Sequence, residues 1–197
     1  MAGDGTRWHE RRMISVVIVT HDAEEGLVRS LAALAPFAMD GVVADVIVAD
    51  RGSRDAVSAV ADAAGCAFVA DCPDMGAAVE RAAVLARKDW LLGLMAGDIV
   101  NEAMASALRR HVAEAERMGA RQATAFLALP GNAGRLRRVV AAIAFDRLGL
   151  TRPADRRVLA PRAEAQELAS RAGRWRGVRM RERVTSSSSE WRTVSAE

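Results

Sequence analysis

The chain has 197 residues, of which 51% are hydrophobic, and a formal net charge of +3 at pH 7. This length supports one domain with a sizeable core, and because no run of about 18 apolar residues is present, we expect no membrane-spanning helix. Two cysteines are too few for a disulfide framework, so we expect free thiols in a cytoplasmic protein, and no signal peptide in the charged N-terminal lead-in.

Predicted strands and helices alternate along the first half of the chain. The apolar, β-branched run MISVVIVT is typical of a fully buried strand, which we expect at 14–19. Similar strands are expected at 43–49, 66–70 and 90–94. The helices between them are predicted at 26–35 and 56–64, and from a turn at 74–77 to about residue 87. This alternation predicts an α/β domain with a largely parallel sheet flanked by helices.

The second half shows the same periodicities with less regularity. We expect a helix at 102–118, a strand at 121–129, a helix at 135–148, a strand at 158–159 and a short helix at 163–172. Because no linker divides the chain, residues 1–184 are predicted to form a single domain. The Ser-rich segment 185–197 is predicted to be a disordered tail.

Polar residues follow the first two predicted strands. Thr20, His21 and Asp22 come after the first strand, and the turn DRGSRD at 50–55 comes after the second. Ligands of open parallel sheets bind at the carboxyl ends of such strands, where carboxylates and hydroxyls can recognise a ribose or a base. An Asp at a strand end is also a common turn former, and the residues alone leave both roles open for Asp50.

A helix start follows the first of these clusters. Asp22 is expected to cap this helix, and Glu24 and Glu25 place negative charge in its first turn, where the helix dipole favours it. His21 lies at the same predicted edge and is a candidate contact for a base or a phosphate.

Four segments in this order resemble the N-terminal half of family 2 glycosyltransferases: ISVVIVTHDAEEGLVRSLAAL, DVIVADRGSRD, MGAAVERA and KDWLLGLMAGDIV. The similarity covers about residues 13–112, and a weaker one continues through GRLRRVVAAIAFDRLGLTRPADRRVLAPR. It implies the GT-A fold, a Rossmann-like sheet in which 13–112 is the nucleotide-sugar-binding half and 113–184 the acceptor-side half. It also implies transfer of a sugar from a nucleotide-sugar donor to a lipid or polysaccharide acceptor.

The resemblance further implies which residues form the nucleotide site. In the family, the Asp at the end of the second strand contacts the base, and this chain has Asp50 there. Arg51 stands at the second Asp of the family's DDGS turn. The remaining residues that match nucleotide-facing positions, or that offer a counter-charge to the phosphates, are Thr20, Asp22, Glu24, Gly52, Ser53 and Arg81.

The paired-carboxylate (DxD) motif of the family is degenerate in this chain. The family pattern places two carboxylates after the fourth strand to hold a divalent cation on the diphosphate, and the alignment puts Met95 and Gly97 there. Their side chains cannot ligate Mg²⁺ or Mn²⁺, so Asp98 is left to hold a weak or substrate-dependent cation. In the alternative, arginines such as Arg51 and Arg81 replace the cation as the counter-charge of the diphosphate.

The catalytic base is assigned only through the resemblance. An inverting transferase needs a carboxylate that takes the proton from the acceptor hydroxyl. The position that matches is Asp155, which Arg156 and Arg157 follow where the family has Gln and Gly. A solvent-exposed Asp–Arg loop is the alternative interpretation of this segment.

Charge is distributed unevenly along the chain. Residues 1–98 carry nine basic and 15 acidic residues, a balance of −6, and residues 99–197 carry 19 and ten, a balance of +9. The basic half is a candidate for peripheral contact with anionic lipid at the inner face of the membrane, or it is a solvated face. Aromatic residues scarcely interleave with its arginines, so no nucleic-acid partner is expected.

Two other functions stay open at this point. The first is a catalytically impaired protein of the same fold that binds a nucleotide or a partner protein. The second is a basic-surfaced scaffold at a membrane or on nucleic acid. A thermal-shift screen of UDP- and GDP-sugars, with and without Mn²⁺, separates these functions, because a ligand that binds only the native state raises its melting temperature.

Overall fold

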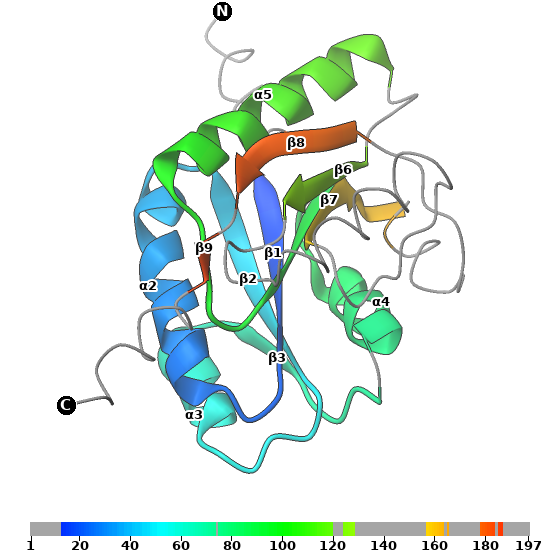
Figure 1. The fold of residues 1–197 in the computed structure, drawn as a ribbon. Helices are drawn as coiled ribbons and strands as arrows, with labels where there is room; N and C mark the ends of the chain where they lie inside the picture. The colour runs from blue at the N-terminus through cyan, green and yellow to red at the C-terminus, as the bar shows by residue number, and fades with distance from the viewer. Residues whose placement is uncertain are drawn as a thin grey trace, which may run out of the picture.

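The computed structural model describes residues 13–73, 75–119, 124–128, 157–163, 165, 178–183 and 185–186. These residues form a mixed α/β structure around a seven-stranded sheet with strand order β3-β2-β1-β4-β7-β6-β8 (Figure 1). A second, two-stranded sheet pairs β5 with β9. This architecture confirms the predicted α/β class with a mostly parallel sheet.

The parallel part of the sheet consists of β1 (Ile14–Thr20), β2 (Val43–Asp50), β3 (Ala67–Val69) and β4 (Trp90–Met95). Each of these strands agrees with its predicted range to within one residue at either end. All seven residues of β1 are buried. Burial of the whole strand is expected for a central parallel strand with both faces covered, and it explains why β1 is apolar without alternation.

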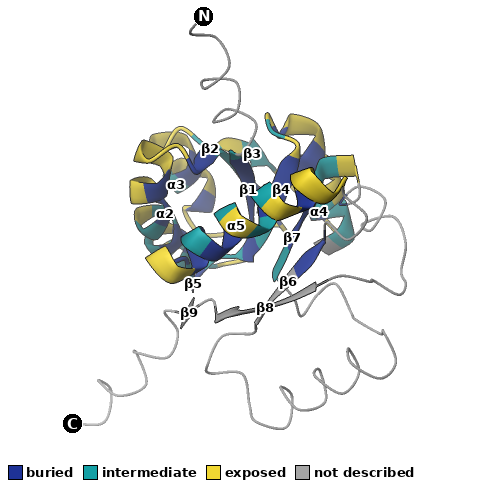
Figure 2. Ribbon diagram, turned by 90° about the horizontal axis from the view of Figure 1, so that it is seen from above, coloured by how far each residue is buried: buried dark blue, intermediate teal, exposed yellow. Residues whose placement is uncertain are grey.

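Helices cover both faces of the parallel strands (Figure 2). They are α2 (Glu24–Met39), α3 (Val57–Ala63), α4 (Met75–Leu85) and α5 (Glu102–Met118). Val16 and Ile18 of β1 share a core with α2, α3 and α5, whereas Val17 and Val19 share the other core with α4. Successive side chains of a strand point to opposite faces, so one apolar run supplies both cores.

The second half of the chain adds three strands to the seven-stranded sheet, β6, β7 and β8, and forms the separate β5–β9 pair. Its elements are β5 (Asp98–Ile99), β6 (Ala125–Ala128), β7 (Arg157–Pro161), β8 (Val178–Arg183) and β9 (Thr185–Ser186). β7 runs antiparallel to β4 and to β6, whereas β8 is parallel to β6. Because β7 is antiparallel to β4, its first residue, Arg157, lies beside the carboxyl end of β4.

The predicted tail requires one correction. The composition predicts a disordered tail from residue 185, but Thr185 and Ser186 pair with Ile99 and Asp98, so the structured part extends at least through β9. The Ser-rich composition does not reveal this because such a short strand depends on its partner and not on local propensity. The helix predicted at 135–148 and residues 187–197 lie outside the described residues. Among the described helices, none has the length and apolar character needed to cross a bilayer.

Candidate functional site

The carboxyl ends of β1, β2 and β4 lie side by side at one end of the parallel strands, and we call this side of the sheet its carboxyl edge. Thr20 is the register partner of Asp50, and Val19 is the register partner of Met95. The backbone N–H of Arg51 donates to the carbonyl of Thr20 at 3.0 Å. The structure therefore brings the predicted strand tips together, as expected for a parallel sheet.

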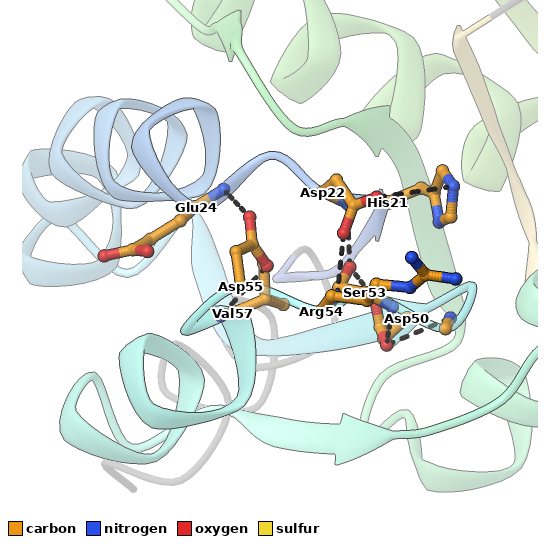
Figure 3. A network of polar contacts seen from close by, with 9 residues as sticks. His21, Asp22, Glu24, Asp50, Ser53, Arg54, Asp55 and Val57 are labelled. Atoms are coloured by element: carbon orange, nitrogen blue, oxygen red, sulfur yellow. Dashed lines mark hydrogen bonds and ion pairs between the residues drawn. The ribbon is translucent and has the colours of Figure 1, made fainter.

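The loop after β1 and the loop after β2 are joined by hydrogen bonds in both directions (Figure 3). The backbone N–H of Asp22 donates to the Ser53 hydroxyl at 2.9 Å, and the N–H of Arg54 donates to Asp22 Oδ1 at 2.7 Å. The N–H of Glu24 donates to Asp55 Oδ2 at 2.8 Å. These bonds fix the two loops relative to one another before any ligand binds.

The prediction that Asp22 caps α2 is wrong. The N-cap residue is Ala23, which offers no side-chain cap, and the N–H of Glu24 is instead satisfied by Asp55 from the neighbouring loop. Asp22 has a φ of 46°, in the left-handed region that Asp tolerates better than most residues. Its carboxylate bonds to Arg54 across the gap between the loops, so it is not available to its own helix.

Asp50 forms the turn that follows β2. Its Oδ2 accepts from the N–H groups of Gly52 at 3.1 Å and Ser53 at 2.9 Å, and its Oδ1 accepts from the Ser53 hydroxyl. Gly52 has a φ of 85°, which favours glycine at this position. Of the two roles that the sequence left open for Asp50, the turn-forming role is present in the structure. The residue is only 5% exposed.

Thr20 carries an unusual hydroxyl. The residue is 1% exposed, and its Oγ1 has no hydrogen-bond partner within the described part of the chain. A buried hydroxyl without a partner costs about 1–3 kcal/mol. An unpaired polar group at the edge where ligands of this sheet type bind is a reason to look for function there, because local costs of this kind concentrate at functional sites.

Thr20→Val tests that cost directly. The substitution keeps the side-chain shape and removes the unpaired hydroxyl, so the free energy of unfolding should rise by about 1 kcal/mol. Urea denaturation followed by circular dichroism measures the change. The matched control is Ser30→Ala, which removes a buried hydroxyl that accepts from the N–H of Gly97 at 2.9 Å and should lower the same free energy. Loss of stability in Thr20→Val would show that Oγ1 has a native partner.

Arg81 contacts the segment that follows β3. Its Nη1 donates to the carbonyls of Ala70 and Asp71, each at 3.3 Å. The N–H of Cys72 in turn donates to the carbonyl of Asp50 at 2.8 Å, which places this segment directly beside the Asp50 turn. Burial raises the pKa of the Cys72 thiol above its ordinary value, against the lowering effect of the Arg81 guanidinium. Both cysteines are free thiols, as expected.

The turn at 95–98, which follows β4, is closed by Asp98. The N–H of Met95 donates to Asp98 Oδ2 at 2.8 Å. The turn is held against α2 because the N–H of Gly97 donates to the carbonyl of Gly26 at 3.0 Å and to the Ser30 hydroxyl at 2.9 Å. Asp98 is 1% exposed, so its carboxylate is a buried charge that needs a partner.

That partner is Arg157, which the sequence analysis did not assign to the site. Its Nε lies 2.5 Å from Asp98 Oδ2 and its Nη2 lies 2.8 Å from Oδ1, which is a bidentate ion pair. The Arg157 side chain is 14% exposed. The signal in the sequence was the pair of arginines after Asp155, but nothing local connects them to a residue 59 positions earlier. Asp155 itself lies outside the described residues.

The predicted nucleotide-binding residues therefore gather at one edge of the sheet. The strand tips and the two joined loops supply Thr20, Asp22, Glu24, Asp50, Gly52 and Ser53, and Arg81 holds the adjoining segment. In the described part of the chain, no group of three or more His, Cys, Asp and Glu side chains is placed to hold a metal ion.

Comparisons with known proteins identify the fold. No protein-family model matches the chain, and no match was found among the curated proteins. Among solved structures, the chain is similar to glucosyl-3-phosphoglycerate synthase from Mycobacterium tuberculosis in complex with phosphoglyceric acid, with 20% identity and a TM-score of 0.56. That match covers 83% of this chain and 63% of the synthase chain.

Two further structures give the same picture. The same synthase in complex with Mn²⁺, UDP-glucose and phosphoglyceric acid matches at 21% identity and a TM-score of 0.56, over 83% of this chain and 62% of that one. A mycobacterial protein matches at 23% identity and 0.56, over 77% and 54%. The chain thus spans less than two thirds of these structures. At such identities the similarity shows the fold alone, and the fold is the GT-A architecture that the resemblance implied.

Proposed function

We propose that the chain is a glycosyltransferase-like protein, related to family 2, that binds a nucleotide-sugar at the carboxyl edge of its sheet and transfers the sugar to an acceptor. The observation that carries this proposal is the convergence of Thr20, Asp50 and the turn at 95–98 at one edge of a GT-A fold. Two of the synthase structures with this fold are complexes with UDP and with UDP-glucose, which makes uridine nucleotides the first ligands to test.

The geometry suggests how Asp50 would act. An ionised carboxylate has about four lone-pair sites, and Asp50 uses three for its own turn. One site is left for an N–H of a base or a hydroxyl of a ribose, and the turn holds the carboxylate rigidly for that contact. Arg51 and Arg54 are exposed in the same loop and offer positive charge to phosphate groups.

The rest of the proposed reaction depends on the family resemblance. Asp155 would act as the base that takes the proton from the acceptor hydroxyl. A lipid or polysaccharide acceptor, a cytoplasmic location and peripheral contact with the inner face of the membrane are likewise proposals, supported by the resemblance and by the basic second half. The synthase structures contain phosphoglyceric acid or glycerol 3-phosphate, so small phosphorylated acceptors belong in the same assay.

A specific departure from the family motif favours a second candidate, nucleotide binding without transfer. Met95 and Gly97 stand at the two carboxylate positions, and Gly97 has a φ of 95° that an Asp would adopt only with strain. The two candidates differ in one measurement. A transferase releases UDP from UDP-glucose in the presence of an acceptor, whereas a binding protein returns the donor intact.

Asp50→Asn separates the ligand role of Asp50 from its turn role. The amide keeps an oxygen acceptor for the turn but loses the charge, so the variant should fold and should bind UDP at least about tenfold more weakly, as expected for a lost charge-assisted hydrogen bond. Isothermal titration calorimetry gives the two Kd values. Asp62→Asn, an exposed carboxamide substitution on α3, is the matched control. Equal affinity in Asp50→Asn and wild type would show that Asp50 only forms the turn.

A further inference from the structure

We propose that the guanidinium of Arg157, held by Asp98, is the resident cation of the site, and that a nucleoside diphosphate binds there without a divalent cation. The inference rests on the proposed function, because it concerns the same nucleotide. It also decides between the two possibilities that the sequence left open, a cation on Asp98 or an arginine in its place.

The residues at this position do not fit a divalent cation. Mg²⁺ and Mn²⁺ need oxygen ligands, and neither Met95 nor Gly97 supplies a side-chain oxygen. Asp98 already uses three of its about four lone-pair sites, since Oδ1 accepts from Arg157 and Oδ2 accepts from Arg157 and from the N–H of Met95. A metal ion would have to displace the guanidinium or lie directly beside its positive charge, at a carboxylate that is 1% exposed.

The pair lies at the correct edge of the sheet. Arg157 is the first residue of β7, which is antiparallel to β4, so it stands where the parallel strands end. Asp98 closes the turn that directly follows β4. β4 is the neighbour of β1 and β1 is the neighbour of β2, which places the pair on the same edge as Thr20 and Asp50.

The net charge of the Asp98–Arg157 pair equals the net charge of a divalent cation held by the two carboxylates of the family motif. A divalent cation on two carboxylates is neutral in sum, and so is one guanidinium on one carboxylate. Arg157 binds Asp98 through Nε and Nη2, and its Nη1 has no partner among the described residues. A guanidinium carries five N–H donors in a planar fork that suits phosphate oxygens, so Nη1 can donate to a diphosphate while Asp98 fixes the plane.

The test measures UDP affinity by calorimetry on the full chain, once with EDTA and once with Mn²⁺. We expect the two Kd values to agree within about twofold, because the cation is already part of the protein. Electron paramagnetic resonance of Mn²⁺ with the protein alone should show no binding at micromolar concentration. UDP binding that requires Mn²⁺, or tight Mn²⁺ binding by the protein alone, would overturn the inference and leave the proposed function standing.

A second experiment tests whether Arg157 is responsible for UDP binding in the absence of a divalent cation. Arg157→Gln alone leaves a buried charge, so the test uses Asp98→Asn with Arg157→Gln, which removes both charges together. After circular dichroism confirms folding, we expect UDP affinity in EDTA to fall at least about tenfold. Arg109→Gln, which removes a partly exposed arginine paired with Glu102 on α5, should leave the affinity unchanged. Unchanged affinity in the double variant would refute the role of Arg157, and absence of UDP binding under all conditions would refute the proposed function and this inference together.

Discussion

Arg157→Gln is expected to destabilise the fold by about 3–5 kcal/mol, the largest loss expected for a single substitution at this edge. The reason is the charge left behind: Asp98 is 1% exposed, and without the guanidinium its carboxylate keeps, among the described residues, only the N–H of Met95. Urea denaturation monitored by circular dichroism gives the free energy of unfolding.

The double variant Asp98→Asn with Arg157→Gln is the control for this expectation. Replacing a buried ion pair by neutral groups is often close to neutral, whereas removing one partner is not. The double variant should therefore recover most of the stability lost in Arg157→Gln. A single variant that loses less than about 1 kcal/mol, the range of a surface ion pair, would show that the pair is not buried in solution.

Gly26→Ala is expected to displace the turn at 95–98 and to lower the free energy of unfolding by about 1–3 kcal/mol, the usual cost of overpacking. A Cβ at this position would lie 3.1 Å from the backbone nitrogen of Gly97 and 3.2 Å from the carbonyl carbon of Ala96. Both neighbours are backbone atoms, so they cannot move aside as a flexible side chain could. The better helix propensity of Ala, worth at most about 1 kcal/mol, acts against this loss and should not cancel it.

Gly93→Ala is the matched control for this substitution. Its Cβ would meet the carbonyl oxygen of Val158 at 3.7 Å, which is ordinary van der Waals contact. We expect a change within about 0.5 kcal/mol in that variant. Because the turn carries Asp98, Gly26→Ala should also weaken UDP binding, whereas Gly93→Ala should not. Equal free energies of unfolding in the two variants would show that the turn at 95–98 shifts to accommodate the added Cβ without a loss of stability.

The parallel half of the fold could be predicted from sequence because its signals are local. The run at 14–20 is apolar and β-branched without alternation, which is what burial on both faces requires, and its polar ends mark the edge of the sheet. The resemblance to family 2 glycosyltransferases also rests on these segments. For the same reason the grouping of Thr20, Asp50 and Asp98 at one edge was expected.

The roles of individual side chains at that edge were less predictable. Asp22 directly precedes α2 in the sequence and so is the local candidate for its cap, whereas the acceptor for the N–H of Glu24 is Asp55, 31 positions away. The sequence does not decide whether Asp50 contacts a ligand or forms a turn. The turn role depends on the positions of the N–H groups of Gly52 and Ser53. Arg157 was missed because its partner lies 59 positions away. Contacts of this kind are set by the packing of strands, which no local pattern encodes.

The most direct test of the account is a map of the nucleotide on the protein by ¹H–¹⁵N correlation spectra during titration with UDP-glucose. The account expects the largest shifts in the backbone amides of 20–24, 50–55 and 95–98, which form the carboxyl edge of the sheet. The opposite edge provides the internal control, since the N–H of Lys88 bonds to Ser15 and the Ser15 hydroxyl bonds to Asp45 there. Shifts confined to that opposite edge, or no shifts at millimolar UDP-glucose, would contradict the proposal that this chain binds a nucleotide-sugar at the tips of its parallel strands.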